Sequence, residues 1–226
     1  MAARPLGAGT FVGWTGRADG DLRPPADAVA AAALEHLVGR PVAWARQVHG
    51  GDVAVVERAG PAGPADALVT SSTGVAVAVF TADCAPVALS GGDGSAPDQL
   101  VAAVHAGWRG LVAGVVEATV GVLRNRGATA IVAALGPCIH GECYAFGRRE
   151  LELVVGRFGA DVASTTADGR PALDLPAAVR ISLERAGAVL RHEDATCTAC
   201  AALSCFSHRA RSDSGRQAMA VWRSRD

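Results

Sequence analysis

Short apolar runs of strand length recur through the first two-thirds of the chain. Gly74–Thr81 alternates valine with alanine, and Leu100–His105 and Ala130–Leu135 are equally apolar. Runs of this length, rich in β-branched residues and bounded by glycine or polar residues, are typical of β-strands. We therefore expect these three segments to form strands.

Shorter runs predict further strands. They are Thr10–Trp14, Val42–His49, Asp52–Glu57, Ala67–Thr70, Pro86–Ser90 and Gln217–Trp222. Gly50 and Gly51 separate the second of these runs from the third, which is a signal for a β-hairpin. Residues 61–64 and 91–97 are expected to form loops, and residues 1–23 to be irregular apart from the first strand.

Four segments are predicted to be helices: Ala26–Val38, Leu111–Arg126, 148–158 and 175–187. Gly39 and Gly127 follow the first two and would end them. Asp174 is placed to cap the last helix, with Pro176 in its first turn. The second helix lies between two predicted strands, and no linker or repeat divides the sequence. We expect one α+β domain over residues 1–226.

Composition narrows the possible functions. Half of the 226 residues are hydrophobic and the net charge is −1, so no broad attraction to nucleic acid or to an anionic membrane is expected. All basic residues other than histidine are arginine, which removes lysine as a nucleophile. No apolar run reaches membrane-spanning length, and the N-terminus lacks a secretory signal pattern. We expect a cytoplasmic protein whose six cysteines are thiols.

Three residues at predicted strand ends carry the most specific chemistry. His49, Cys84 and His105 are remote in sequence, but strand ends can bring them to one point. Two imidazoles and one thiolate suit Zn²⁺, and three protein ligands leave a fourth position open. Alternatively, Cys84 is a nucleophile with His105 as its base. The simplest alternative is a buried cysteine and two unrelated histidines.

Two charged residues flank these candidates. If the chain bends before Pro86, Asp83 can orient an imidazole or act as a general base; otherwise it caps a turn. Arg109 stands at a helix start four residues after His105, where it can bind a phosphate or carboxylate. A surface salt bridge is the alternative for Arg109.

The C-terminal segment adds donors and thiols. These hydrogen-bond donors either form an anion pocket or lie on a solvated surface. They are Ser207, His208, Arg209, Arg211, Ser214 and Arg216. Cys197 and Cys200 form a CxxC, which is a redox pair, two packed thiols, or half of a zinc site completed by Cys205 and His208. Cys138 and Cys143 form a further local metal site, or a loop packed beside the main site.

Several short motifs occur in an order that identifies a family. They are Gln47–Gly50, Ala65–Leu68, Thr81–Cys84, Ala103–Gly110, Leu135–Ile139, Cys143–Tyr144, Asp174–Leu175, Cys197–Thr198, Phe206–Ser207 and Ser214–Arg216. With these motifs the chain resembles the laccase-domain family of purine nucleoside phosphorylases. That family formerly bore the name multicopper polyphenol oxidases and includes peptidoglycan editing factors. The resemblance covers about residues 42–223.

The resemblance implies a single four-layer α/β/β/α domain with mixed sheets and a zinc site formed by His49, Cys84 and His105. It also implies phosphorolysis of adenosine, inosine and methylthioadenosine to base and ribose 1-phosphate, together with adenosine deamination. We expect Cys84, His105 and Asp83 to be catalytic. Candidate contacts to nucleoside and phosphate are Gln47, Arg109 and Arg216. A monomer or small homo-oligomer is expected.

The chain departs from the family pattern at the pocket rim. Residues 11–40 lack the usual Asn-Leu-Gly segment, Ala145 stands where glutamate is usual, and His208 replaces a tyrosine. Three other functions stay open: a cysteine hydrolase or amidase acting on peptidoglycan precursors, a copper polyphenol oxidase, and a binding module that zinc merely stabilises. Copper is less favoured than zinc because six histidines without a His-x-His pair are too few for a multicopper centre.

Overall fold

Alternating side chains of the central strands face two different cores. The computed structural model describes residues 1–22, 28–93 and 100–224. In strand β7 (Ala76–Thr81), Val77 and Val79 pack between two sheets, whereas Ala78 and Phe80 pack on the opposite face with helix α1 (Ala28–Val38). Because successive residues of a strand point to opposite faces, a strand apolar on both faces is covered on both sides.

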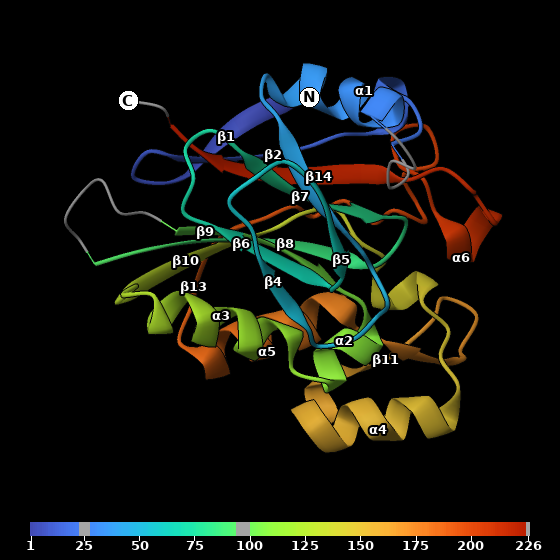
Figure 1. Ribbon diagram of the computed structural model, residues 1–226. Coiled ribbons are helices and arrows are strands. Elements are labelled where there is room, and N and C mark those ends of the chain that lie inside the picture. The colour runs from blue at the N-terminus through green and yellow to red at the C-terminus, as the bar shows by residue number, and fades with distance from the viewer. Residues whose placement is uncertain (23–27, 94–99, 225–226) are drawn as a thin grey trace.

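Two six-stranded mixed sheets stack on each other (Figure 1). In spatial order, the first contains β1 (Ala2–Gly7), β2 (Thr10–Trp14), β14 (Gln217–Arg223), β7, β3 (Val42–Arg46) and β5 (Gly60–Pro64). The second contains β13 (Val189–Glu193), β10 (Ala130–Leu135), β8 (Ala85–Gly92), β9 (Leu100–Ala106), β6 (Ala67–Thr70) and β4 (Val53–Val55). β11 (Ala163–Thr165) and β12 (Pro171–Leu173) form a small separate sheet.

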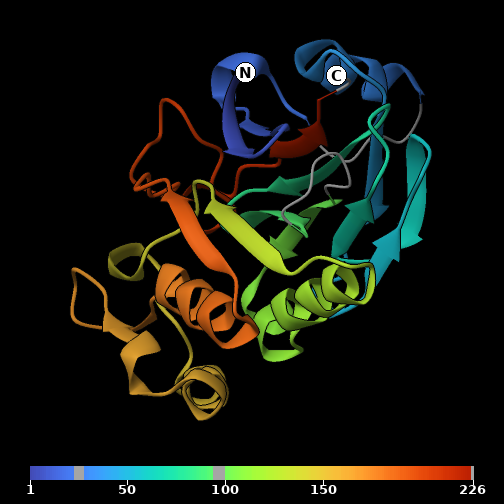
Figure 2. The same cartoon turned by 90° about the vertical axis from the view of Figure 1, so that its left-hand side faces the viewer.

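Helices cover the outer faces of both sheets. α1 packs on the first sheet, while α3 (Val115–Asn125) and α5 (Leu175–Ala186) lie side by side on the second, as the side view shows (Figure 2). The remaining helices are α2 (Trp108–Val112), α4 (Arg148–Phe158), α6 (His208–Arg211) and the 3-10 turns η1 (Arg17–Asp19), η2 (Gly141–Cys143) and η3 (Ala160–Val162). This confirms the predicted α+β fold with four layers of helix, sheet, sheet and helix.

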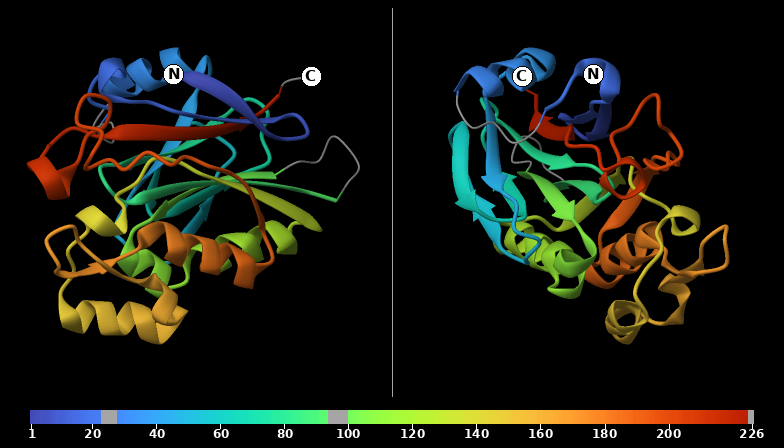
Figure 3. Two further views of the ribbon diagram at one scale, coloured as in Figure 1. Left: turned by 180° about the vertical axis from the view of Figure 1, so that it is seen from behind. Right: turned by 90° about the vertical axis from the view of Figure 1, so that its right-hand side faces the viewer.

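Several predicted elements are confirmed. α4 and α5 match the expected ranges, Asp174 accepts a hydrogen bond from the backbone N–H of Ala177 at 2.8 Å, and β14 is the expected last strand. β14 lies beside β2, so both ends of the described chain lie in the first sheet (Figure 3). Residues 26–27 of the first predicted helix and 94–97 of a predicted loop lie outside the described residues.

The predicted hairpin between β3 and β4 is wrong, because the two strands belong to different sheets. The glycine pair carries the chain from one sheet to the other, and a Cβ on Gly51 would lie only 2.9 Å from the carbonyl oxygen of Ala113. The glycines therefore permit a close approach between segments rather than a tight turn.

Three other expectations also differ from the structure. The predicted helix 111–126 is divided because Gly114 adopts a left-handed φ of 84°, which ends α2 and begins α3. The predicted loop 61–64 belongs to β5, an edge strand, where prolines are tolerated because no partner needs their missing N–H groups. The N-terminal segment forms β1, paired antiparallel with β2. No helix within the described ranges is long and apolar enough to cross a bilayer.

Candidate metal centre and active-site pocket

A buried carboxylate organises the first candidate ligand. Asp66 is fully buried and accepts hydrogen bonds from three consecutive backbone N–H groups: Val48 at 3.1 Å, His49 at 2.9 Å and Gly50 at 2.7 Å. His49 adopts a left-handed φ of 60°, a conformation that costs a residue with a Cβ about 1–2 kcal/mol. The three hydrogen bonds to Asp66 offset this cost and fix the position of the His49 side chain.

The same carboxylate orients the second imidazole. Nδ1 of the buried His105 lies 2.8 Å from Oδ1 of Asp66. A carboxylate at this distance only accepts, so Nδ1 carries the proton and Nε2 is the ring nitrogen left for a metal. The sequence pointed to Asp83 for the orienting role and assigned none to Asp66, although the Ala65–Leu68 motif contains it.

The structure brings His49, Cys84 and His105 together. Their ligand atoms all lie within 4.8 Å of one another, with Cys84 Sγ 3.9 Å from Nε2 of His49. The two imidazole rings meet nearly edge to face, with centroids 4.8 Å apart. They are delivered by the loop after β3, the turn between β7 and β8, and the penultimate residue of β9.

Gly107 leaves room for this cluster. A Cβ at this position would lie 3.1 Å from Cδ2 of His49 and 3.2 Å from Sγ of Cys84. Its backbone is extended, with φ −75° and ψ 159°, so the requirement for glycine comes from space rather than from backbone conformation. This explains the glycine two residues after His105.

Charge at the cluster favours a thiolate. Burial alone would raise the pKa of Cys84, but the neighbouring His105 and hydrogen bonds from both imidazoles lower it below the usual thiol value. Burial alone would lower the pKa of His105, because it disfavours the charged imidazolium. The Cys84 thiolate and the Asp66 carboxylate stabilise that charge by more, so the pKa of His105 is raised. The thiolate suits Zn²⁺, and His105 would become a nitrogen ligand once the metal displaces the proton on its Nε2.

The cluster lies in a pocket of about 700 Å³, a size typical of small-molecule sites. The pocket is lined by Gln47, His49, Phe80, Thr81, Ala82, Asp83, Cys84, His105, Tyr144, His208, Arg209 and Arg216. Both ends of the Gln47 amide bond the backbone of Phe80, at 2.7 and 2.8 Å, so this residue fixes the pocket wall. Nη1 of Arg216 donates to the carbonyls of residues 213–215 at 2.8–3.1 Å, which holds that side chain at the rim.

Arg109 lies elsewhere. Its guanidinium stacks on Trp108, 4.4 Å from the ring centroid, and it lines a neighbouring cavity instead of the main pocket. Arg209 lines both cavities. It lies over the ring of Tyr144, 5.0 Å from the centroid, and donates to the Ala145 carbonyl at 3.1 Å. Tyr144, the only tyrosine of the chain, was not predicted as a pocket residue.

Asp83 does not orient an imidazole, since its two carboxylate oxygens bond elsewhere. One accepts from the hydroxyl of buried Thr198 and the other from the backbone N–H of Arg209, both at 2.7 Å. Its φ of 97° turns the chain sharply before Cys84. Of the three roles considered for Asp83, the contacts match a turn residue that accepts N–H groups.

The cysteines group differently from expectation. Cys197 and Cys200 lie beside Cys143 and Glu142, not beside Cys205 and His208. Cys205 is buried near Ser204, and His208 begins α6 and lines the main pocket. The other expected donors divide between roles: Ser207 caps α6, and Arg211 donates to the carbonyls of residues 198, 199 and 205.

The sequence is similar to those of purine nucleoside phosphorylases from several bacteria. It is 41% identical over 186 residues to a purine nucleoside phosphorylase of Streptomyces coelicolor, covering 80% of this chain and 74% of the relative. It is 36% identical over 197 residues to a purine nucleoside phosphorylase of Mycobacterium tuberculosis, covering 84% and 76%. Both alignments are long enough to carry family membership.

Solved structures agree with the sequence relatives. A protein of Neisseria meningitidis superposes with a TM-score of 0.79 at 28% identity, covering 98% of this chain and 97% of that one. YlmD from Geobacillus stearothermophilus superposes with a TM-score of 0.77 at 27% identity, covering 96% and 93%. Residues 26–224 match the family described as multi-copper polyphenol oxidoreductase laccase. The chain belongs to this family, and its relatives from Streptomyces and Mycobacterium bear the name purine nucleoside phosphorylase.

Proposed function

We propose that the protein is a zinc-dependent purine nucleoside phosphorylase. It would convert adenosine, inosine or methylthioadenosine and phosphate to the free base and ribose 1-phosphate. The observation that carries this proposal is the convergence of His49, Cys84 and His105 in a pocket that also contains Arg209 and Arg216. The names of the relatives from Streptomyces and Mycobacterium support it.

His49, Cys84 and His105 would hold the zinc ion, which supplies a Lewis acid with one open coordination position. Asp66 keeps the imidazole of His105 in the tautomer that presents Nε2, and Gly107 keeps side-chain atoms away from the cluster. These contacts predispose the site to bind a metal before substrate arrives.

The basic residues of the rim would bind phosphate. Arg209 and Arg216 both line the pocket, and a guanidinium offers paired N–H donors that match a phosphate. Asp83 accepts a hydrogen bond from the backbone N–H of Arg209 at 2.7 Å. Asp83 would therefore assist phosphate binding indirectly, by positioning Arg209. Gln47 acts in the same indirect manner by fixing the backbone of β7 at Phe80. Arg109 in the neighbouring cavity would add positive charge near the rim.

The pocket walls would bind the nucleoside. Phe80 and Tyr144 line the pocket, and an aromatic ring suits a purine. Adenosine deamination at the same site is a second reaction, since the open position of the metal suits activation of water as well as of phosphate. Whether phosphate or water attacks depends on which occupies the site beside the substrate.

The test is to incubate adenosine with the purified chain, with and without phosphate, and to measure adenine, ribose 1-phosphate and inosine by chromatography. We expect phosphate-dependent release of adenine and ribose 1-phosphate, its loss on chelation, and its recovery on adding zinc. Cys84→Ala should be inactive, while Asp52→Asn, an exposed aspartate outside the pocket, should be unaffected. No turnover by the wild type, or full turnover by Cys84→Ala, contradicts the proposal.

One observation favours a second candidate. Asp66, His105 and Cys84 form a chain of contacts like that of a cysteine hydrolase, in which an acid orients a histidine that activates a thiol. A peptidoglycan-fragment amidase would use this arrangement without a metal. Its signature is activity in metal-free protein that is abolished when iodoacetamide labels Cys84. Loss of all activity on chelation would instead support the phosphorylase.

A further inference from the structure

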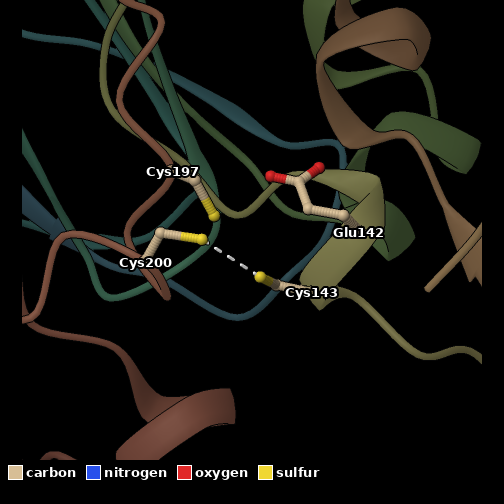
Figure 4. Close-up of side chains that lie close together, drawn as sticks. All are labelled: Glu142, Cys143, Cys197 and Cys200. Atoms are coloured by element: carbon tan, nitrogen blue, oxygen red, sulfur yellow. Dashed lines mark hydrogen bonds between the residues drawn. The ribbon is translucent and has the colours of Figure 1, made fainter. Parts of the chain in front are cut away.

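A second group of potential metal ligands lies outside the pocket. The sulfur atoms of Cys143, Cys197 and Cys200 and a carboxylate oxygen of Glu142 all lie within 4.8 Å of one another. Sγ of Cys143 and Sγ of Cys200 are 3.3 Å apart (Figure 4). None of these four residues lines the main pocket.

Two segments remote in sequence form the group. Glu142 and Cys143 belong to the 3-10 turn η2, while Cys197 and Cys200 belong to the turn that follows β13. A backbone bridge between Cys138 and Cys197 joins the segments, and the N–H of Thr198 donates to the Cys138 carbonyl at 3.0 Å. The backbone therefore holds together the two segments that carry the sulfurs.

The backbone also offers a hydrogen-bond donor to one sulfur. The N–H of His140 donates to Sγ of the buried Cys197 at 3.5 Å. Hydrogen bonds of this kind orient the ligand atoms of metal sites. Cys200 and Glu142 are exposed, so an ion has a path from solvent.

Three sulfurs and one carboxylate are more than a disulfide uses. A disulfide between Cys143 and Cys200 would leave the Cys197 sulfur beside it without a function. Four protein ligands of this kind instead match a closed, tetrahedral zinc site, and thiolates select soft ions.

We propose that Cys143, Cys197, Cys200 and Glu142 bind a second zinc ion, which has a structural role. The ion would join two segments that both reach the pocket. Tyr144 follows Cys143 and lines the pocket, and Thr198 follows Cys197 and donates to Asp83 at 2.7 Å. Binding at the second site thus fixes the relative position of two pocket walls without contacting substrate.

The first test is zinc content. The full chain is loaded with zinc, passed through a desalting column and measured by atomic emission. The wild type should hold about two ions per chain and the double variant Cys143→Ser/Cys200→Ser about one. Cys84→Ala should also hold one, and the control Cys205→Ala should hold as much as the wild type, because Cys205 is outside both groups. A double variant that keeps the wild-type zinc content overturns the proposal, whatever that content is.

The second test uses only the wild type, so it does not depend on folding of a variant. Cysteines are alkylated with iodoacetamide in the presence and absence of zinc, under reductant, and mapped by mass spectrometry. We expect zinc to protect the exposed Cys200 and the half-buried Cys143, which alkylate without it. Equal labelling in the two samples, or recovery of a Cys143–Cys200 disulfide from reduced protein, overturns the proposal.

Discussion

The carboxylate of Asp66 accepts a hydrogen bond from Nδ1 of His105 at 2.8 Å, and it also accepts the backbone N–H of His49 at 2.9 Å. One buried side chain thus sets the ring orientation of one candidate ligand and the backbone conformation of another. Such outer partners of metal ligands determine both tautomer and geometry.

Replacing Asp66 by asparagine should therefore weaken metal binding. An amide cannot accept as strongly from Nδ1 and all three N–H groups, so we expect zinc affinity at the pocket site to fall about 10–100-fold. Competition with a fluorescent chelator measures this affinity. Asp161→Asn, at an exposed aspartate of η3, is the matched control and should bind like the wild type. Equal affinity in the two variants would show that Asp66 does not orient the ligands.

Gly107→Ala should affect the same site by crowding. The new methyl group would lie 3.1 Å from His49 and 3.2 Å from Cys84, so the ligands must move for it to fit. We expect a loss of zinc affinity and activity with a retained circular dichroism spectrum.

Gly121→Ala is the control for this change. Gly121 lies inside α3, where a Cβ meets nothing within 4 Å, so alanine should stabilise the fold by about 0.5–1 kcal/mol. Normal activity in Gly107→Ala would mean that the pocket tolerates displaced ligands, contrary to expectation.

Thr198→Val should destabilise the C-terminal turn. Its hydroxyl donates to Asp83 at 2.7 Å between two buried side chains, and valine leaves that carboxylate oxygen without this partner. Leaving a buried acceptor unsatisfied costs about 1–3 kcal/mol, which urea unfolding detects. Thr196→Val, at a half-buried position in the same turn, should change stability by less than about 0.5 kcal/mol. An equal loss of unfolding free energy in the two variants would show that the hydrogen bond to Asp83 does not stabilise the turn.

Asp213 gives the C-terminal loop a pH dependence. Its carboxylate accepts hydrogen bonds from the Ser207 N–H at 2.9 Å and from Arg17 and Arg211. These contacts hold the pKa of Asp213 below the usual value, and the N–H of Ser207 is the main cause. Its contribution to stability is present above the unfolded-state pKa of about 3.9 and is lost as pH falls through the lower folded value.

Asp213→Asn should therefore lower the melting temperature at neutral pH and leave it less sensitive to acid than the wild type. Melting curves between neutral pH and about pH 3 measure this, with exposed Asp161→Asn as control. A wild type and variant with parallel melting curves over that range would contradict the assignment.

The regular elements could be predicted because their patterns are local. The valine–alanine alternation of β7 and the aspartate cap of α5 follow from neighbouring residues alone. The Gly50–Gly51 pair shows where local signals fail, because the same dipeptide suits a hairpin or a close approach to another segment. Only the packing of Gly51 against Ala113 decides between the two.

The candidate ligands were found from their motifs, but their surroundings were not. Asp66 lies 17 residues from His49 and 39 from His105, so no spacing rule connects them. Arg109 was expected at the pocket because it opens a helix, yet stacking on Trp108 places it in the neighbouring cavity. Arg209 reaches the pocket instead, through tertiary contacts with Asp83 and Tyr144 that the sequence does not reveal.

The most direct test of the proposed metal centre is diffraction from crystals grown with zinc, with data collected on both sides of the zinc absorption edge. We predict an anomalous peak at bonding distance from Nε2 of His105, Sγ of Cys84 and an imidazole nitrogen of His49, with one side of the ion facing the pocket. A map without a peak between these three side chains would contradict the proposed site and the phosphorylase mechanism together.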